Sequence, residues 1–146
     1  MRVVVQRVTR AAVRVGDETV GTIGAGAVVL TGIGTADDAA TVDRMADRLV
    51  VLRYFEDDAG RTDRSIIDAG GELLVVSQFT LLADVRRGRR PGFTDAARPE
   101  VAAPLVERFA ERLRAAGIRV ATGRFGATMS LELVNDGPFT LVIDSS

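Results

Sequence analysis

Two hydroxyl side chains and one carboxamide lie together near the middle of the sequence, where the run LLVVSQFTLL at 73–82 contains Ser77, Gln78, Phe79 and Thr80. Such groups can orient a substrate or stabilise an oxyanion, and a threonine hydroxyl is a candidate nucleophile. The short apolar segment before them predicts a strand buried on both faces. A buried polar group without a partner costs about 1–3 kcal/mol. Either the strand therefore ends at Ser77 and its polar tip lines a cavity, or these polar atoms bond within the core.

Four arginines follow this tip in the segment ADVRRGRRPGF at 83–93, namely Arg86, Arg87, Arg89 and Arg90. A polar strand end that continues into a flexible cationic loop is a candidate site for an anionic ligand. The alternative is a solvated loop that binds nothing. The formal net charge of the chain is −1, which argues against a broadly basic surface that binds nucleic acid without specificity.

Absent residue types narrow the chemistry further. The 146 residues include no cysteine and no histidine, which excludes disulfides, a cysteine nucleophile, a Ser-His-Asp triad and zinc sites built from Cys or His. The carboxylates at 56–58 lack the regular spacing of a calcium loop and are typical of a solvated turn. We therefore expect no metal and no cofactor.

One domain, residues 1–146, with one sizeable core is expected from the chain length and the apolar content of 47%. The N-terminal run MRVVVQRVTR has too few apolar residues for a signal peptide. No segment approaches the roughly 20 apolar residues of a membrane span. These features predict a soluble, cytoplasmic protein without a membrane partner.

Two segments with apolar residues at helical spacing predict helices, at 37–53 and 98–117. Thr35 or Asp37 could cap the first helix. The second should begin shortly before Pro104, which would then lie in the first turn, where a missing amide is tolerated.

Segments rich in β-branched residues, separated by glycine-containing turns, predict the strands. They cover 2–8, 11–15, 18–23, 27–31, 65–68, 73–76, 119–122, 127–134 and 139–143. Many strands with two helices indicate a single domain of the α/β class.

The segment NDGPFT at 135–140 is the second stretch that could carry a function. Asn-Asp-Gly is an ordinary hairpin-turn signal, and Pro138 fixes φ and removes an amide donor. Only about 5–6% of X-Pro bonds are cis, so the residues alone favour a turn with a trans bond between Gly137 and Pro138.

Taken together, LVVSQFTL at 74–81 and LVNDGPFT at 133–140 resemble the paired signatures of the D-aminoacyl-tRNA deacylases. Phe139 stands where that family more often has valine, and Gly92 stands where serine is common. The resemblance covers nearly the whole chain, through VVQRVTRAAV at 4–13, IGAGAVVLTGI at 23–33, GGELLVVSQFTL at 70–81, RGRRPGF at 87–93 and TGRFGATMSLELVNDGP at 122–138.

This resemblance implies a mostly antiparallel β-sheet or barrel with two helices packed on it. It also implies an editing enzyme that hydrolyses the ester between a D-amino acid and the 3′-terminal adenosine of tRNA, and that removes glycine from wrongly charged tRNA. Members of the family are homodimers with the active site at the subunit interface. The partners expected for this chain are therefore tRNA and a second copy of itself.

The resemblance also implies roles for individual residues. Gly137 and Pro138, joined by a cis bond in the family, would enter the pocket of the other subunit, where their carbonyls hold the amino group and exclude an L side chain. Met129 would lie close to the terminal adenosine. The pocket would be lined by Ser77, Gln78, Phe79 and Thr80. In the arginine loop, Arg86, Arg87, Arg89 and Arg90 would contact phosphates of the acceptor stem.

The lack of histidine is compatible with this chemistry, because an aminoacyl ester is already activated and the ribose 2′-hydroxyl can help to activate water. The enzyme then needs mainly orientation and oxyanion stabilisation. Backbone amides at Phe79 and Thr80 could supply the latter. We expect Thr80 to position the substrate rather than to act as the nucleophile, because no base is near it in the sequence.

Two alternatives remain open from the sequence. One is an editing module for a wrong L-amino acid, like the N-terminal editing domain of archaeal threonyl-tRNA synthetases, which shares the fold. The other is a non-catalytic module that binds RNA ends or nucleotides. A chiral filter made by Gly137 and Pro138 beside the Ser-Gln-Phe-Thr tip argues against both.

Overall fold

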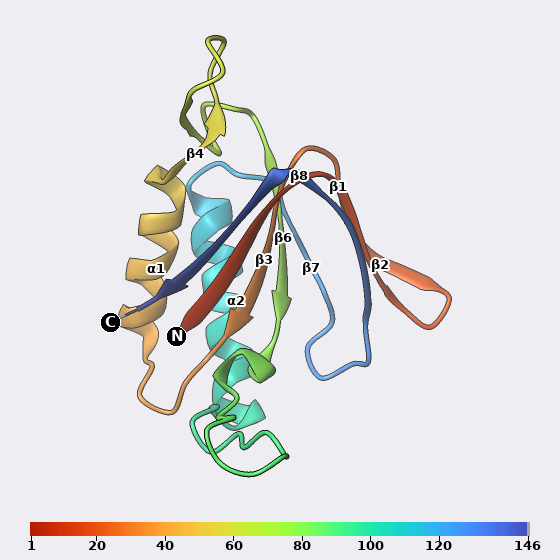
Figure 1. The fold of residues 1–146 in the computed structure, drawn as a ribbon, viewed down its shortest axis with the longest axis vertical. Helices are drawn as coiled ribbons and strands as arrows, with labels where there is room; N and C mark the ends of the chain where they lie inside the picture. The colour runs from red at the N-terminus through yellow and green to blue at the C-terminus, as the bar shows by residue number, and fades with distance from the viewer. Residues whose placement is uncertain (146) are drawn as a thin grey trace.

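The strand β1 (Arg2–Val15) organises the sheet, because three other strands pair with it, all antiparallel. In this computed structural model, which describes residues 1–145, β3 (Gly26–Gly32) pairs with the first half of β1 and β2 (Glu18–Ile23) with the second half. The last strand, β8 (Ser130–Asp144), pairs along the opposite edge of β1 over nearly its whole length (Figure 1).

Two parallel pairings extend the sheet beyond β3. The strand β6 (Glu72–Ser77) pairs with β3, and β7 (Val120–Thr122) pairs with β6. From there the sheet curls back toward β2, since a Cβ built on Gly21 of β2 would lie 2.6 Å from the carbonyl oxygen of Thr122. The sheet is thus a nearly closed barrel with mostly antiparallel pairing, and this confirms the predicted fold class.

The helices α1 (Ala39–Val51) and α2 (Pro99–Ala115) lie side by side against the sheet (Figure 1). Two arginines of α2 join them to α1: Arg108 contacts Asp43 at 2.7 Å, and Arg112 contacts Asp47 at 2.9 Å. Both predicted helices are therefore confirmed. No helix in residues 1–145 combines the length and apolar character that crossing a bilayer requires.

The starts of the two helices differ from the prediction. Asp38 caps α1 by accepting a hydrogen bond from the amide three residues further on, so neither Thr35 nor Asp37 is the cap. Pro99 is the first residue of α2, where its fixed φ favours helix initiation. Pro104 consequently lies inside α2, beyond the first turn, and removes one internal hydrogen bond.

Strand continuity was underestimated by the sequence prediction. Segments predicted as separate strands at 2–8 and 11–15 form the single strand β1, because pairing with β8 continues across Thr9 and Arg10. A hairpin that the prediction missed, β4 (Arg53–Glu56) with β5 (Thr62–Ser65), projects beyond the end of the sheet at the top of Figure 1.

The core has two parts that meet on β6. Leu73 and Val75 face the core beneath the helices, together with Leu49 of α1 and Phe109 of α2. The alternate residues Leu74 and Val76 face a smaller core inside the curve of the barrel. The prediction that this strand is buried on both faces is therefore correct, and its tip has a fixed position.

Candidate active site

A cavity of about 390 Å³ lies at the end of β6, where the apolar strand gives way to polar residues. Ser77, Gln78 and Phe79 line it, and Met129 lines it from the segment between β7 and β8. Pairing with β3 fixes this tip, because the Gln78 amide still donates to the Thr31 carbonyl at 2.8 Å. The strand therefore ends at a cavity rather than within the core.

The backbone turns sharply at this tip into the short 3-10 helix η1 (Phe79–Leu82). Phe79 and Thr80 are its first two residues, and the first amides of a helix have no acceptor within it. Neither amide bonds to a backbone carbonyl elsewhere in residues 1–145. Two adjacent N–H donors are therefore available beside the cavity.

Thr80 does not line the cavity, unlike the three residues before it. Its side chain is exposed, and its hydroxyl accepts a hydrogen bond from the side-chain amide of Gln78. Thr80 is thus placed to fix the orientation of Gln78, which does line the cavity.

The arginine loop is anchored at the mouth of this cavity. Phe93 packs edge-on against Phe79, with ring centroids 5.0 Å apart. Asp84 and Gly92 exchange two backbone hydrogen bonds of 2.7 and 2.8 Å, which close the loop at its base. In Figure 1 the loop lies at the bottom of the molecule, below the end of β6.

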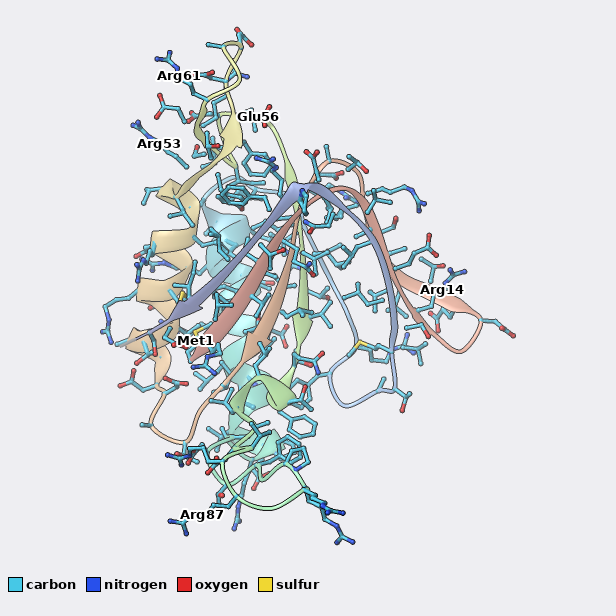
Figure 2. All side chains as sticks on the ribbon, viewed as in Figure 1. Met1, Arg14, Arg53, Glu56, Arg61 and Arg87 are labelled. Atoms are coloured by element: carbon cyan, nitrogen blue, oxygen red, sulfur yellow. The ribbon has the colours of Figure 1, made fainter. Side chains whose placement is uncertain are left out.

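The four predicted arginines of this loop are not equivalent. Arg86 is held by Asp84, with a Nη2–Oδ2 distance of 2.8 Å, and these hydrogen bonds lower the pKa of Asp84. Arg87, Arg89 and Arg90 are exposed and have no ion-pair partner within residues 1–145. Figure 2 shows the side chain of Arg87 extending away from the ribbon. Three cations are therefore available to a ligand.

Gly137 and Pro138 lie in a bulge of β8 rather than in a hairpin turn. Between two paired positions, β1 advances two residues, from Val8 to Gln6, while β8 advances five, from Asn135 to Thr140. The chain then continues as the same strand, so the predicted strands at 127–134 and 139–143 are one. The excess length of β8 makes Gly137 and Pro138 protrude from the ladder.

The bulge is at the opposite end of the sheet from the cavity. Val8, next to the bulge, pairs with Gly26, and Gly26 pairs with Glu72 at the start of β6. The cavity is at Ser77, the last residue of β6. Within one chain the structure therefore does not bring Gly137 and Pro138 to the Ser-Gln-Phe-Thr tip.

The expected cis bond is not present in this structure. Residues 1–145 contain no cis peptide bond, so Pro138 follows a trans bond. The expectation of a Gly-cisPro motif, which came from the family resemblance, is corrected accordingly. The trans form is the intrinsically favoured one, and it keeps the chain extended between the two paired parts of β8.

Arg7 fixes the position of the bulge, and the sequence analysis did not identify this residue. Its side chain is only 6% exposed, and it donates to the carbonyls of Tyr54 at 2.8 Å and Asp136 at 3.2 Å. The guanidinium also lies 4.9 Å from the ring centroid of Phe139. Gly137 has a φ of +112°, which residues with a side chain rarely adopt, and a Cβ there would also approach Arg7 Nη2 to 2.5 Å, so this position favours glycine.

Asn135 closes the bulge on the other side. Its side-chain N–H group donates to the carbonyls of Arg7 at 2.8 Å and Phe139 at 3.1 Å. The ends of the bulge are thereby tied to each other and to β1. The protruding Gly137 and Pro138 have a defined position although they are exposed.

Comparison with known proteins gives consistent matches over the full length of the chain. A family model described as D-Tyr-tRNA(Tyr) deacylase matches residues 4–144. A D-aminoacyl-tRNA deacylase of Roseiflexus sp. (strain RS-1) is 59% identical over 146 residues, which are 100% of this chain and 94% of the relative. One of Symbiobacterium thermophilum is 61% identical over 145 residues, covering 99% of this chain and 96% of the relative.

The chain belongs to the D-Tyr-tRNA(Tyr) deacylase family.

Two solved structures share the fold of this chain. The c-Myc DNA unwinding element binding protein superposes with a TM-score of 0.94 at 41% identity, covering 100% of this chain and 99% of the other. A structure described as a probable eukaryotic D-amino acid tRNA deacylase superposes with a TM-score of 0.87, covering 97% of each chain. At 21% identity this second match shows the fold alone.

In this member of the D-Tyr-tRNA(Tyr) deacylase family, Phe139 has a structural role at the bulge. Its ring lies under the Arg7 guanidinium and packs against the main core, so it supports the bulge where valine would offer no cation–π contact. A signal for Arg7 was present in the sequence, because it is in phase with the inward-facing Val3 and Val5 of β1. An arginine at an inward position of a strand needs several partners.

The cavity of this D-Tyr-tRNA(Tyr) deacylase family member has no ionisable side chain among its lining residues. The described part of the chain also holds no group of three or more Asp or Glu residues placed to bind a metal ion. What the cavity offers is backbone amides, the hydroxyls of Thr31, Ser77 and Thr128, a carboxamide and apolar walls. Such an arrangement can orient a substrate and stabilise negative charge.

Proposed function

We propose that this chain, acting as a single domain in the cytoplasm, hydrolyses the ester that joins a D-amino acid to the 3′-terminal adenosine of tRNA. Water adds to the ester carbonyl, the bond to the ribose oxygen breaks, and that oxygen takes up a proton. The observation that carries the proposal is the cavity at the end of β6, with unpaired amides beside it, in a chain of this family.

The amides of Phe79 and Thr80 stabilise the oxyanion that forms in this step. One such donor typically contributes about 2.7–4 kcal/mol to the transition state. The ribose 2′-hydroxyl of the substrate assists the water, which is consistent with a cavity whose lining residues include no base. Thr80 acts by orienting Gln78, to which it is hydrogen-bonded, rather than as the nucleophile.

Gly137 and Pro138 of a second copy act as the chiral filter in a homodimer whose site lies at the interface. The bulge is at the far end of the sheet from the cavity of its own chain, so only another copy can supply it. Main-chain atoms reject an L substrate by shape, whatever its side chain. Glycine has no side chain to reject, and glycyl-tRNA is therefore also a substrate. Met129, in the cavity wall, contacts the terminal adenosine.

Arg87, Arg89 and Arg90 contact phosphates of the acceptor stem, and Arg86 contributes less because Asp84 already holds it. Replacing the three exposed arginines with alanine should weaken tRNA binding and reduce the salt dependence of the affinity. Each lost contact lowers the slope of log K against log salt by about 0.7–0.9. Arg86→Ala is the matched control with a smaller change, and an unchanged slope in the triple variant would identify a solvated loop.

A non-catalytic role in nucleic-acid binding is the second candidate, and one observation favours it. A structure 41% identical to this chain is described as a protein that binds a DNA unwinding element. A binding module needs neither unpaired amides beside a cavity nor a protruding Gly-Pro segment. The alternative of an L-amino-acid editing module is distinguished by the stereochemistry of the substrate.

The deciding experiment compares hydrolysis of D-Tyr-tRNA and L-Tyr-tRNA by the purified protein in the presence of EDTA. Rapid loss of the D ester with the L ester intact is the expected result. Loss of neither ester would favour the binding module. Loss of both would show that Gly137 and Pro138 are not the filter, and loss of the L ester alone would indicate the other editing activity.

A further inference from the structure

A second cavity, of about 240 Å³, lies between α2 and the strands β6 and β7. It adjoins the first cavity, because Ser77, Val106 and Phe125 line both. Phe125 is 39% exposed, so its ring is accessible between them. Ligand pockets for whole small molecules measure about 300–1,000 Å³. A ligand of the second cavity must therefore be smaller than one that fills the first.

The polar groups of this cavity are of two kinds. Arg114 is engaged, since it donates to the Val120 carbonyl at 3.1 Å and contacts Glu111 at 2.6 Å. Glu107 is exposed, and its carboxylate has no hydrogen-bond or ion-pair partner among residues 1–145. The hydroxyl of Thr122 likewise donates to no group of the described chain. The cavity thus offers one unengaged acceptor and one unengaged hydroxyl beside an aromatic ring.

We infer that this second cavity binds the base that precedes the terminal adenosine of tRNA, a cytosine, by stacking on Phe125 and by hydrogen bonding to Glu107. Single-stranded RNA ends are recognised by stacking on aromatic rings and by contacts to base edges. A carboxylate accepts from the cytosine N4 amino group, and a hydroxyl can donate to the cytosine O2 or N3. Uracil presents an acceptor in place of N4, so Glu107 rejects it.

This inference rests on the proposed function, because only a terminal adenosine in the first cavity brings the preceding base to the second. Shared lining residues make the two cavities adjacent, as consecutive nucleotides require. The cavity adds a check on the 3′ end of the substrate that is independent of the amino acid.

The test uses the dinucleotides CpA and UpA as inhibitors of D-Tyr-tRNA hydrolysis by the full chain. CpA should inhibit at a concentration about 5- to 10-fold lower than UpA, since one base contact of this kind is typically worth about 1 kcal/mol or more. In Glu107→Gln the carboxamide can donate to uracil O4, and the ratio should fall to about 1. Glu100→Gln, an exposed change in the first turn of α2, should keep the wild-type ratio.

Equal inhibition by CpA and UpA in the wild type, or inhibition by neither, overturns the inference while hydrolysis of D-Tyr-tRNA still supports the proposed function. A ratio that survives in Glu107→Gln also overturns the role of this carboxylate. If D-Tyr-tRNA is not hydrolysed at all, it is the proposed function that fails. The two failures are therefore distinguishable in one series of measurements.

Discussion

The tip of β6 and the bulge of β8 are held in place by contacts of very different range. At the tip, Gln78 bonds to Thr80 two residues away, and Phe79 packs on a ring of the loop that follows. At the bulge, Arg7 bonds to Asp136, 129 positions later in the chain. The side chains of the tip are therefore oriented by local contacts on a backbone that pairing with β3 fixes, whereas the bulge depends on side-chain contacts from distant parts of the chain. Substitutions in the two regions should consequently have different signatures.

The largest effect is expected from Gly137→Ala. The residue has a φ of +112°, and an added Cβ would meet Arg7 Nη2 at 2.5 Å, so the bulge backbone or the Arg7 side chain that supports it must move. A displacement of about 1 Å can reduce a rate by roughly 100-fold, and we expect at least ~100-fold slower hydrolysis of D-Tyr-tRNA. The measurement is single-turnover deacylation.

Gly60→Ala is the matched control for that substitution. Gly60 also has a positive φ, of +76°, but it belongs to the β4–β5 hairpin, and a Cβ added there would meet nothing within 4 Å. It should show a similar loss of stability, of the order of 1–3 kcal/mol, with an unchanged rate. If both variants lost activity equally, backbone strain rather than the position of the bulge would explain the result.

Arg7→Ala should have the next largest effect and should change two quantities together. Loss of this buried cation should lower the free energy of unfolding by about 2–3 kcal/mol, less than for a fully buried pair because Asp136 and Glu56 are half exposed. Freed from Arg7, the bulge should also discriminate less well, so the ratio of D- to L-Tyr-tRNA hydrolysis should fall by at least ~10-fold. Urea unfolding and paired deacylation assays measure the two effects.

Arg10→Ala is the control that tests whether the effects expected for Arg7→Ala are specific to Arg7. Arg10 is exposed and pairs with Glu132 on the surface, at 2.8 Å. Its removal should leave both the unfolding curve and the D-to-L ratio at wild-type values. A fall of the D-to-L ratio in this variant would contradict the proposal that Arg7 in particular fixes the position of the bulge.

Thr80→Ala should have a smaller effect, because the tip is stabilised by several local contacts. Loss of one hydrogen bond to Gln78 corresponds to about 0.5–1.5 kcal/mol, and hence to a rate reduction of at most ~10-fold. Complete loss of turnover with unchanged tRNA affinity, together with a trapped acyl intermediate in the wild type, would instead establish Thr80 as a nucleophile. Quench-flow kinetics and mass spectrometry distinguish these outcomes.

The smallest functional effect is expected from substitutions outside both the tip and the bulge, in the ion pairs that join α1 to α2. Hydrogen bonds from Arg108 and Arg112 lower the pKa values of Asp43 and Asp47 in the folded state. Such carboxylates stabilise the fold above their unfolded pKa, about 3.9, and the contribution disappears as the pH falls through the folded pKa. The thermal midpoint should therefore fall more between pH 6 and pH 3 in the wild type than in Asp43→Asn/Asp47→Asn, with equal deacylation rates at pH 7.

What could be predicted from the sequence follows the same division between local and distant contacts. The buried strand at 73–76, its end at Ser77 and both helices were correct, because periodicity and adjacent polar residues determine them. The continuity of β8 was missed, since Asn-Asp-Gly-Pro is a turn signal locally and only pairing with β1 keeps the strand extended. The partners of Arg7 lie 47 and 129 positions away, beyond any local pattern.

The pairing of β1 with β8 also determines when the protein can become active during its synthesis. β1 leaves the ribosome well before the bulge and β8, and their pairing joins positions as far apart as Arg2 and Asp144. Contacts of such long sequence separation form slowly, and the nascent chain holds β1 without this partner until β8 has been synthesised. Premature termination anywhere before Gly137 therefore yields a chain without the segment that we propose as the chiral filter, and an unpaired β1 edge that favours aggregation.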